Sequence, residues 1–426
     1  MTTTKDLSKH PCFNRESAGS CGRVHLPVAP KCNIMCNFCN RKYDCVSESR
    51  PGVTSAVLTP EQAVLYMDKV LEKEPRITVC GIAGPGDPMA NPEALETVRL
   101  LKDKYPQMLF CLSTNGLALP AHAAELAELG VTHVTVTVNA VDPKIGAKIY
   151  SWARDGKVIH RGEAAARLLL ERQIEGIKIL KAKGVIVKSN TIVIPGVNDH
   201  HVLEVSKVLS ELGVDIQNIM PIFPVADTPF AEVEAPSSEM IKDLREKAGG
   251  LVPQMSHCRR CRADAVGLLC NDRSGELAPL LGECSRTVPG ADLEKRPYVA
   301  VATREGMLVN MHLGEAHKFQ IWKQEAVGFS FVEDRWAPDP GAGPKRWEEL
   351  AKVLSDCRAV LVAAYGETPR KVLSASGILP YECSGFLETA LAEVYGSGDL
   401  SLLKSRKKGL GKACCGSGGG GGEGCG

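Results

Sequence analysis

The chain of 426 residues has few aromatic residues, 5% of the total, and almost no net charge. Its 51 Lys and Arg against 50 Asp and Glu give a net charge of +1, whereas proteins that grip a nucleic-acid backbone present a basic surface. No apolar run approaches the roughly 20 residues that a membrane helix needs. The first ten residues also lack the apolar segment of a secretory signal. We therefore expect a cytoplasmic protein that binds neither nucleic acid nor a membrane.

Cysteine, in contrast, is abundant, with 17 in the chain. Disulfide frameworks are uncommon in a reducing cytosol, so metal or redox chemistry is the leading interpretation. The cysteines are also clustered. Six lie between residues 12 and 45, a C-x-x-C stands at Cys258 and Cys261, and Cys414, Cys415 and Cys425 lie in a glycine-rich tail.

Short apolar runs alternate with amphipathic stretches from about residue 24 to residue 224. Buried parallel strands have near-continuous apolar sequences, and each crossover places a helix after its strand. We predict strands at 24–30, 77–83, 108–113, 133–138, 185–194 and 216–223. We predict helices at 61–73, 92–104, 121–129, 163–183 and 202–212. Six such units favour an α/β fold, a partial (β/α)6 TIM-like barrel with its active face at the carboxyl ends of the strands.

The composition also predicts how the chain is divided. We expect an N-terminal ligand arm (1–23), the barrel (24–235), an extension with the C-x-x-C (236–290), a linker (291–296), a smaller α/β domain (297–400) and a disordered Gly/Cys-rich tail (401–426). The tail cannot bury a core. In the smaller domain we predict a hairpin-like pair of strands at 298–303 and 307–311, a strand at 359–364 and a helix at 385–395.

Cys32, Cys36 and Cys39 form a C-x3-C-x2-C motif directly after the first predicted strand. Three thiolates on one tight loop can hold three irons of a 4Fe–4S cluster and leave the fourth iron open. An open iron can chelate the amino and carboxylate groups of S-adenosylmethionine (SAM) and pass it an electron. The alternative is a zinc knuckle, but zinc prefers four closed ligands. The position at a strand end favours the cluster.

This motif at this position resembles the radical SAM superfamily, and further motifs resemble the NifB family of nitrogenase cofactor-maturation proteins within it. These motifs are His10-Pro11-Cys12, GIAGPGDP at 81–88, STNG at 113–116, IPGVND at 194–199 and HCRRCRADA at 257–265. The part from residue 297, with HLGEA at 312–316, resembles the NifX-like cofactor-binding domain of longer members, which implies a ribonuclease H-like fold. The resemblance covers nearly all of residues 10–400.

The resemblance implies a radical SAM enzyme that fuses two 4Fe–4S substrate clusters. A SAM-derived carbide and an extra sulfur would be inserted, giving an 8Fe–9S–C precursor of the nitrogenase cofactor. One SAM would donate a methyl group, and a second would yield the 5′-deoxyadenosyl radical that abstracts hydrogen from it. The implied partners are iron–sulfur cluster donors and downstream cofactor-assembly scaffold or carrier proteins. Two alternatives stay open: a radical SAM enzyme with auxiliary clusters acting on a peptide or pterin, and a non-catalytic iron–sulfur scaffold or carrier.

The same resemblance implies soft ligands for the two substrate clusters. We predict His10, Cys45 and Cys111 around one cluster and Cys21, Cys258 and Cys261 around the other, with Cys12 as an additional ligand assigned to neither. Glu48 is predicted to be an oxygen ligand or proton acceptor, with a solvated surface residue as the alternative. A zinc half-site or redox pair remains the alternative for the C-x-x-C, and core packing for Cys111. Cys80, Cys270, Cys284 and Cys357 are expected not to be ligands.

For SAM, the loop Gly84-Pro85-Gly86-Asp87 stands where the superfamily has a Gly-Gly-Glu run touching the methionine amino group. Gly84 and Gly86 permit close backbone approach, and Asp87 can accept a hydrogen bond from the ammonium; a simple βα turn is the alternative. Contacts to the carboxylate, ribose and adenine are predicted at Thr114, Asn115, Asn139, Asn190, Thr191 and Ile192. In the smaller domain His312 and His317, with Cys383 more remotely, are candidates for holding the finished cluster, and surface histidines are the alternative.

Overall fold

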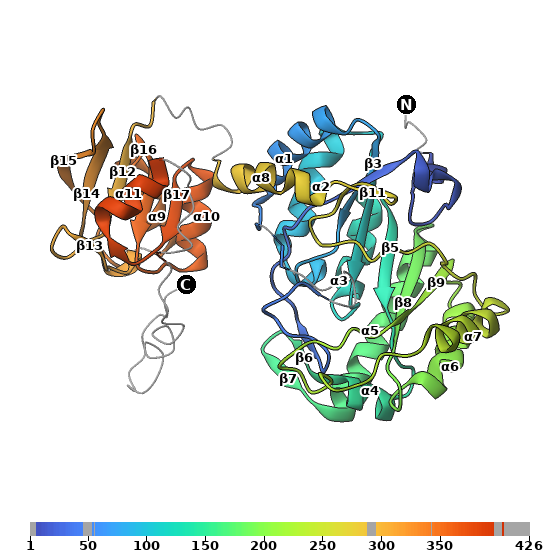
Figure 1. The fold of residues 1–426 in the computed structure, drawn as a ribbon. Coiled ribbons are helices and arrows are strands. Elements are labelled where there is room, and N and C mark those ends of the chain that lie inside the picture. The colour runs from blue at the N-terminus through green and yellow to red at the C-terminus, as the bar shows by residue number, and fades with distance from the viewer. Residues whose placement is uncertain are drawn as a thin grey trace. The chain divides into compact units, whose positions relative to one another are not determined.

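The computed structural model describes residues 6–45, 53–54, 56–287, 295–341, 343–395 and 403. The chain forms two compact units, residues 1–285 and 286–426 (Figure 1). In the described ranges, no helix is both long and apolar enough to cross a membrane. The short 3-10 helices are Leu7–Lys9, Glu16–Gly19, Pro88–Ala90, Asp199–His201 and Leu313–Glu315.

The first unit is built on an eight-stranded sheet in the order β11-β10-β1-β3-β4-β5-β8-β9. Six of these strands are parallel and follow one another in chain order: β1 (Gly22–His25), β3 (Ile77–Ile82), β4 (Leu109–Thr114), β5 (Val131–Thr137), β8 (Ile186–Val193) and β9 (Ile216–Pro221). The connecting helices include α1 (Pro60–Lys73), α2 (Pro92–Lys104), α3 (Leu119–Glu128), α5 (Gly162–Ala182) and α6 (Val202–Glu211). The predicted (β/α)6 arrangement is confirmed, in a sheet whose edges are β9 and β11.

The first strand ends earlier than predicted, at His25 rather than at residue 30. Pro27 and Pro30 lie in the predicted range, and proline has no backbone N–H for a sheet ladder. Just beyond His25, the Leu26 N–H still donates to the Gly81 carbonyl of β3 at 2.9 Å, and Ala29 forms an isolated bridge with Pro85 in the loop that follows β3.

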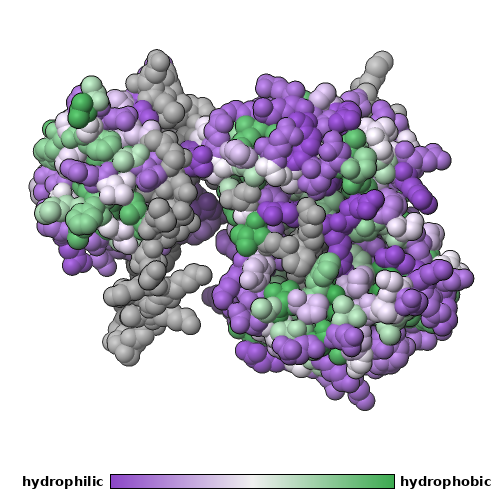
Figure 2. All heavy atoms as spheres, viewed as in Figure 1, coloured by the Kyte–Doolittle hydropathy of each residue, from purple (hydrophilic) through white to green (hydrophobic). Residues whose placement is uncertain are grey.

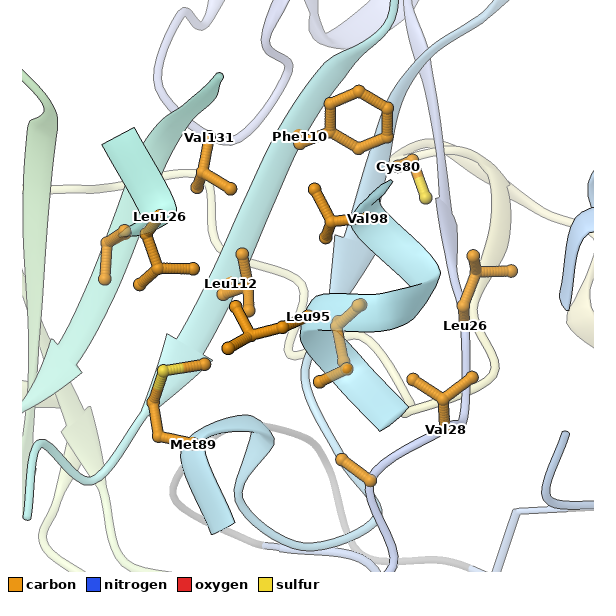
Figure 3. Close-up of a cluster of buried hydrophobic side chains, with 14 of the residues drawn as sticks. Leu26, Val28, Cys80, Met89, Leu95, Val98, Phe110, Leu112, Leu126 and Val131 are labelled. Atoms are coloured by element: carbon orange, nitrogen blue, oxygen red, sulfur yellow. The ribbon is translucent and has the colours of Figure 1, made fainter. Parts of the chain in front are cut away.

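Alternate side chains of each strand face the helices, as the pleat of a strand requires. Figure 3 shows Leu26, Cys80, Phe110 and Leu112 of this face packed with Val98 of α2 in one buried cluster. Cys80 is therefore a core residue, as predicted. The residues between these positions lie on the other face of the sheet, where both pockets described below are found.

Local sequence also fixes where the first helix begins. Thr59 accepts a hydrogen bond from the Gln62 backbone, and the Gln62 side chain accepts one from the Thr59 backbone. This capping box satisfies two N–H groups that a helix leaves unpaired, and Pro60 at the first position needs none. The sequence Thr-Pro-Glu-Gln therefore specifies the start of α1.

Several elements of the first unit were not predicted. β10 (Val266–Leu268) and β11 (Asn271–Asp272) extend the sheet antiparallel beside β1. A small sheet joins β2 (Ile34–Cys36) to β6 (Tyr150–Asp155) and β7 (Val158–His160), with α4 (Pro143–Ile149) just before β6. The extension also holds α7 (Ser238–Gly249) and α8 (Ser274–Arg286), the latter reaching the boundary between the units. Because β2 carries Cys36, the small sheet supports the C-x3-C-x2-C segment.

The second unit has a five-stranded sheet in the order β15-β14-β12-β16-β17. Its strands are β12 (Tyr298–Val301), β14 (Lys318–Gln324), β15 (Phe329–Trp336), β16 (Cys357–Val362) and β17 (Leu379–Glu382), and a small pair joins β13 (Leu308–Val309) to β18 (Gly385–Phe386). Its helices are α9 (Pro344–Val353), α10 (Glu367–Ala375) and α11 (Leu387–Tyr395). Figure 2 shows apolar residues gathered on this unit on the face drawn.

The predicted hairpin of 298–303 with 307–311 is wrong. β12 pairs with β14 on one side and with β16 on the other, while β13 pairs with β18. Val299, Ala300 and Val301 are fully buried, so β12 is a central strand that needs partners on both edges. The predicted strand at 359–364 and helix at 385–395 are confirmed as β16 and α11.

Candidate active site and cluster pocket

Two pockets lie on the inner face of the parallel sheet. The first spans about 670 Å³ and the second about 430 Å³, volumes that include space open to solvent. Ser113 and Thr135 line the first pocket, and Asn115 and Thr137, each two residues further along the chain, line the second. Two residues of a strand span about 7 Å. The pockets are therefore neighbours, with the second nearer the carboxyl ends of the strands.

The second pocket gathers the cysteines of the C-x3-C-x2-C motif. Cys32, Cys36 and Cys39 line it, and the Cys39 N–H donates to the Cys36 carbonyl at 3.0 Å, closing a tight turn. Asn115 Nδ2 donates to Cys32 Sγ at 3.7 Å. Burial raises the pKa of Cys32 to about 12 and also raises that of Cys39. These thiols must therefore lose their protons as a metal binds.

The donors of this pocket fit a 4Fe–4S cluster. In the described part of the chain, no three His, Cys, Asp or Glu side chains are placed to hold a single metal ion. A cubane cluster binds each thiolate through a different iron, so its ligands surround a space. Three soft thiols lining one cavity meet that requirement.

A small polar molecule also fits the second pocket. Asn139 lines it and is 1% exposed; its Nδ2 makes no hydrogen bond of standard geometry, and its side chain interacts with the Tyr150 hydroxyl. The Asn139 Oδ1 accepts from the Ile192 N–H at 2.8 Å, which fixes the orientation of the amide. A buried donor without a standard hydrogen bond calls for an acceptor such as a carboxylate or hydroxyl oxygen of a bound molecule.

Asp87 connects two loops at the rim of the second pocket. Its carboxylate accepts hydrogen bonds from Met89 N at 2.9 Å, Thr114 Oγ1 at 3.0 Å and Asn115 N at 2.6 Å. Burial raises the pKa of Asp87 to about 6 in spite of these bonds. Gly86 allows the loop to approach the cysteine segment, because a Cβ there would overlap the Lys31 carbonyl oxygen. Asp87 therefore organises the loops as well as lining the pocket.

The predicted SAM contacts fall into two groups. Gly86, Asp87, Asn115 and Asn139 line the second pocket. The others, Gly84, Thr114, Asn190, Thr191 and Ile192, are not part of its described lining. Thr191 Oγ1 donates to the Val138 carbonyl and accepts from Gln217, so its hydroxyl is used in the sheet. The SAM-binding roles of both groups stay predictions.

The first pocket brings together soft donors from distant parts of the chain. It is lined by His10 and Cys12 of the N-terminal arm, Cys111 of β4, and Cys258 and Cys261 of the extension. These residues come from both predicted ligand sets, so the structure groups them in one cavity. Burial raises the pKa of Cys111 to about 12 and raises that of Cys12 further.

Two predicted ligands, Cys45 and Cys21, are not in the lining of the first pocket, and a third falls outside the described residues. Cys45 lines the second pocket beside the motif cysteines. Cys21 is in neither described lining; it precedes β1 at the amino end of the sheet, where the Gly22 N–H donates to the Arg76 carbonyl. Glu48 lies outside the described residues. Their assignments to clusters stay predictions.

His25 lines the first pocket and was missed by the sequence reasoning. Its Nδ1 is 2.9 Å from the Arg262 carbonyl oxygen, which can only accept, so Nδ1 carries the proton and Nε2 the lone pair. Burial lowers the pKa of His25 to about 4, which keeps the ring neutral. A neutral histidine with its other nitrogen held by a carbonyl can bind a metal or accept a proton.

Gly81 lets His25 and Cys111 approach each other. The strand register places His25 opposite Gly81, and Gly81 opposite Cys111. A Cβ on Gly81 would lie 2.8 Å from His25 Cδ2 and 3.1 Å from Cys111 Sγ. The signal for His25 in the sequence was its place at the end of the first strand, one position out of phase with the core residues Val24 and Leu26.

His10 presents a different nitrogen. Its Nδ1 accepts from the Cys12 N–H at 3.2 Å, which leaves the proton of the neutral ring on Nε2. That Nε2 is buried without a partner, and the ring lies 4.3 Å from the His133 ring, centroid to centroid. In this arrangement His10 offers the N–H of Nε2 as a hydrogen-bond donor. The histidine nitrogen with a lone pair toward the pocket is therefore Nε2 of His25. Ligation by His10 stays a prediction.

The second unit places its candidate residues in different surroundings. His312 and His317 are exposed, and His312 Nδ1 accepts from the Gly314 N–H at 3.0 Å at the start of a 3-10 helix. Cys383 is buried in a hydrophobic cluster, and Cys357 in another. The tail cysteines Cys414, Cys415 and Cys425 lie outside the described residues.

Both units match protein-family models. Residues 26–209 match the model described as "Radical SAM superfamily", and residues 295–397 match "Dinitrogenase iron-molybdenum cofactor". Among solved structures, the chain is similar to Streptococcus suis SuiB bound to S-adenosylmethionine, with a TM-score of 0.39 and 14% identity over 53% of this chain and 47% of that one.

Whole-chain relatives are more similar. The chain is 49% identical over 426 residues to the "FeMo cofactor biosynthesis protein NifB" of Chlorobaculum tepidum, covering 99% of this chain and 100% of that protein. It is 39% identical over 403 residues to the protein of the same name from Klebsiella pneumoniae, covering 87% of this chain and 86% of that protein. The chain belongs to the NifB family of FeMo cofactor biosynthesis proteins, within the radical SAM superfamily.

Proposed function

We propose that this protein uses SAM to fuse two 4Fe–4S substrate clusters into an 8Fe–9S–C cluster, with insertion of a SAM-derived carbide and an extra sulfur. The observation that carries the proposal is the first pocket, where soft donors from three parts of the chain lie next to the cysteine-lined second pocket. A radical SAM enzyme with auxiliary clusters acting on a peptide or pterin would also need cysteine ligands, so the choice of iron–sulfur clusters as substrates is supported by the whole-chain similarity to FeMo cofactor biosynthesis proteins NifB. A passive scaffold has no use for the second pocket.

In this proposal the second pocket is the SAM site. Cys32, Cys36 and Cys39 would hold a 4Fe–4S cluster, which together with SAM supplies a methyl group and a 5′-deoxyadenosyl radical. Asn139, beside Tyr150, would direct its buried amide N–H to an acceptor oxygen of SAM. Tyr150, which is 5% exposed and lines the pocket, excludes water from it.

The first pocket would hold the substrate clusters. Cys12, Cys111, Cys258 and Cys261 offer thiolates, and His25 offers a lone pair that binds iron or accepts a proton leaving the inserted carbon. Lys188 lines the same pocket, with its Nζ 5.5 Å from the Phe13 ring. Its positive charge offsets the negative charge of thiolate-bound clusters.

The transfer of carbon between the sites needs only a short path. Lining residues of the two pockets are two positions apart on β5 and at the end of β4, or about 7 Å. A group taken from SAM therefore reaches the clusters without passing through bulk water. Shielding of this kind protects reactive carbon species from side reactions.

Delivery and removal of clusters require partners. We propose iron–sulfur cluster donors upstream and cofactor-assembly scaffold or carrier proteins downstream, in the cytoplasm, where thiols stay reduced. The second unit, through its match to a cofactor-domain model, is proposed to hold the finished cluster for handover.

Replacing Cys258 with Ala tests the proposal. The Cys258→Ala variant should form 5′-deoxyadenosine from SAM at close to the wild-type rate, because the second pocket is intact, but should yield no 8Fe–9S–C product. Cys284→Ala is the matched control, since Cys284 is a fully buried core cysteine away from both pockets. A Cys258→Ala variant that still makes the product would overturn the proposal for this pocket.

A further inference from the structure

Arg23 is a buried charge that the proposed chemistry does not use. It lies on β1 and is 1% exposed. Its Nη1 donates to the Gly267 carbonyl at 2.6 Å and the Leu268 carbonyl at 3.1 Å, and its Nη2 donates to Asp272 Oδ2 at 3.1 Å. The remaining nitrogen, Nε, donates to Cys261 Sγ at 3.3 Å. Every nitrogen of this guanidinium is therefore used.

The bonds to β10 and β11 fix the direction of the Nε–H. A buried guanidinium is costly unless it is paired and hydrogen-bonded, and the carbonyls and Asp272 meet that requirement without any help from Cys261. The Cys261 sulfur is thus an additional acceptor for a donor that is already anchored.

The rest of the C-x-x-C segment is also held against β1. His25, two residues after Arg23 on the same face of the strand, donates from Nδ1 to the Arg262 carbonyl, and its backbone N–H donates to the Ala265 carbonyl at 2.7 Å. The other sulfur of the pair, Cys258 Sγ, accepts from the Arg260 backbone N–H at 3.4 Å. Both sulfurs thus have an N–H donor, and only that of Cys261 comes from a charged side chain.

We propose that Arg23 is a positioning residue whose Nε–H fixes Cys261 Sγ and stabilises the reduced state of the iron–sulfur substrate bound through that thiolate. The inference rests on the proposed function, which puts a substrate cluster at Cys258 and Cys261. Hydrogen bonds to ligand sulfurs are among the factors that set the reduction potential of a cluster. A donor that carries positive charge favours the added electron, so it raises that potential.

The test uses full-length protein in which Cys32, Cys36 and Cys39 are replaced by alanine, so that only clusters of the first pocket remain. This background is reconstituted anaerobically and titrated with dithionite while the reduced clusters are followed by electron paramagnetic resonance. Arg23→Gln should shift one cluster to a more negative midpoint potential, and Arg23→Lys should shift it less because the charge is kept. Asp272→Asn is the matched control: it removes the opposite charge of the same ion pair but keeps the bond to sulfur, so the potential should not become more negative.

An unchanged potential in Arg23→Gln with full iron content would overturn the inference. If the Arg23 variants do not fold, a second test uses the background protein with Arg23 unchanged. This protein is produced with arginine that carries ¹⁵N only at Nε. Pulsed electron paramagnetic resonance of the reduced cluster should then show a weak coupling to ¹⁵N. The coupling should persist in Arg260→Lys, which removes another labelled arginine from the pocket lining. If no ¹⁵N coupling is seen, the inference is also overturned. A different result would show that the proposed function itself is wrong. If no cluster binds at Cys258 and Cys261, replacing both cysteines will leave the iron content of the first pocket unchanged.

Discussion

Gly81→Ala tests whether the first pocket depends on the close approach of His25 and Cys111. The new Cβ would lie 2.8 Å from His25 Cδ2 and 3.1 Å from Cys111 Sγ, and a contact under 3.0 Å forces one of the groups to move. His25 is held through Nδ1 and its backbone N–H, so the displacement falls on Cys111 or on the His25–Arg262 bond. Overpacking of this kind costs about 1–3 kcal/mol, against roughly 5–15 kcal/mol for the stability of a domain. The variant should therefore fold.

The assay compares iron content with SAM cleavage after anaerobic reconstitution. Gly81→Ala should lose roughly the four irons of one 4Fe–4S cluster while still forming 5′-deoxyadenosine, since the second pocket is not touched. Gly146→Ala is the matched control, because a Cβ on Gly146 would lie equally close, 2.8 Å, to the Ala166 Cβ, at a contact between α4 and α5. It should be destabilised to a similar extent and keep all of its iron.

Full iron content and normal product formation in Gly81→Ala would refute the reasoning. That result would mean that His25 and Cys111 do not need to face each other across Gly81 for clusters to bind. If both Gly81→Ala and Gly146→Ala lost iron from both pockets, the cause would be general destabilisation. That result would also remove the support for a specific site at Gly81.

Three further predictions concern the second pocket and the core. Cys36→Ala should abolish 5′-deoxyadenosine formation, measured by chromatography, because the loop loses one of its three thiolates; residual turnover above a tenth of wild type would contradict the assignment. Folding raises the pKa of Asp87 from 3.8 to about 6, so its stabilising contribution is complete below pH 4 and is lost as the pH rises through 6. The unfolding free energy of Asp87→Asn relative to wild type, from urea titrations, should therefore improve by about 3 kcal/mol between pH 3 and pH 8, and a difference independent of pH would be inconsistent with this. Phe110→Ala, at a 1% exposed core position, should lower stability by about 3–5 kcal/mol in the same titration, and a loss under 1 kcal/mol would mean that the cluster under α2 is loosely packed.

The barrel could be predicted from the sequence because its signals are local. Each parallel strand is a short apolar run, and each is followed by an amphipathic stretch of helical length. The signals were weaker where pairing is not local. β10 and β11 together span seven residues, Val266 to Asp272, and they are strands only because β1 offers an edge to pair with. β12 looked like half of a hairpin, yet its partners β14 and β16 begin at residues 318 and 357.

The site was predictable in its residue types and less so in its grouping. The motif cysteines and the C-x-x-C stand out by spacing. Which cysteines share a cavity depends on strand register and on the path of the N-terminal arm, so Cys45 and Cys111 were placed together but line different pockets. His25 was overlooked because a histidine within an apolar strand has the appearance of a core residue. Its role emerges only from its tautomer and from the space above Gly81.

The most direct test of the central claim follows the methyl group of SAM. The protein is reconstituted anaerobically with iron and sulfide, and dithionite is added together with SAM carrying a CD3 methyl group. We predict both S-adenosylhomocysteine and 5′-deoxyadenosine, deuterium in the 5′-deoxyadenosine, and iron sufficient for three 4Fe–4S clusters per chain. Unlabelled 5′-deoxyadenosine without S-adenosylhomocysteine would contradict carbide insertion, because the radical would then take its hydrogen from something other than a transferred methyl group.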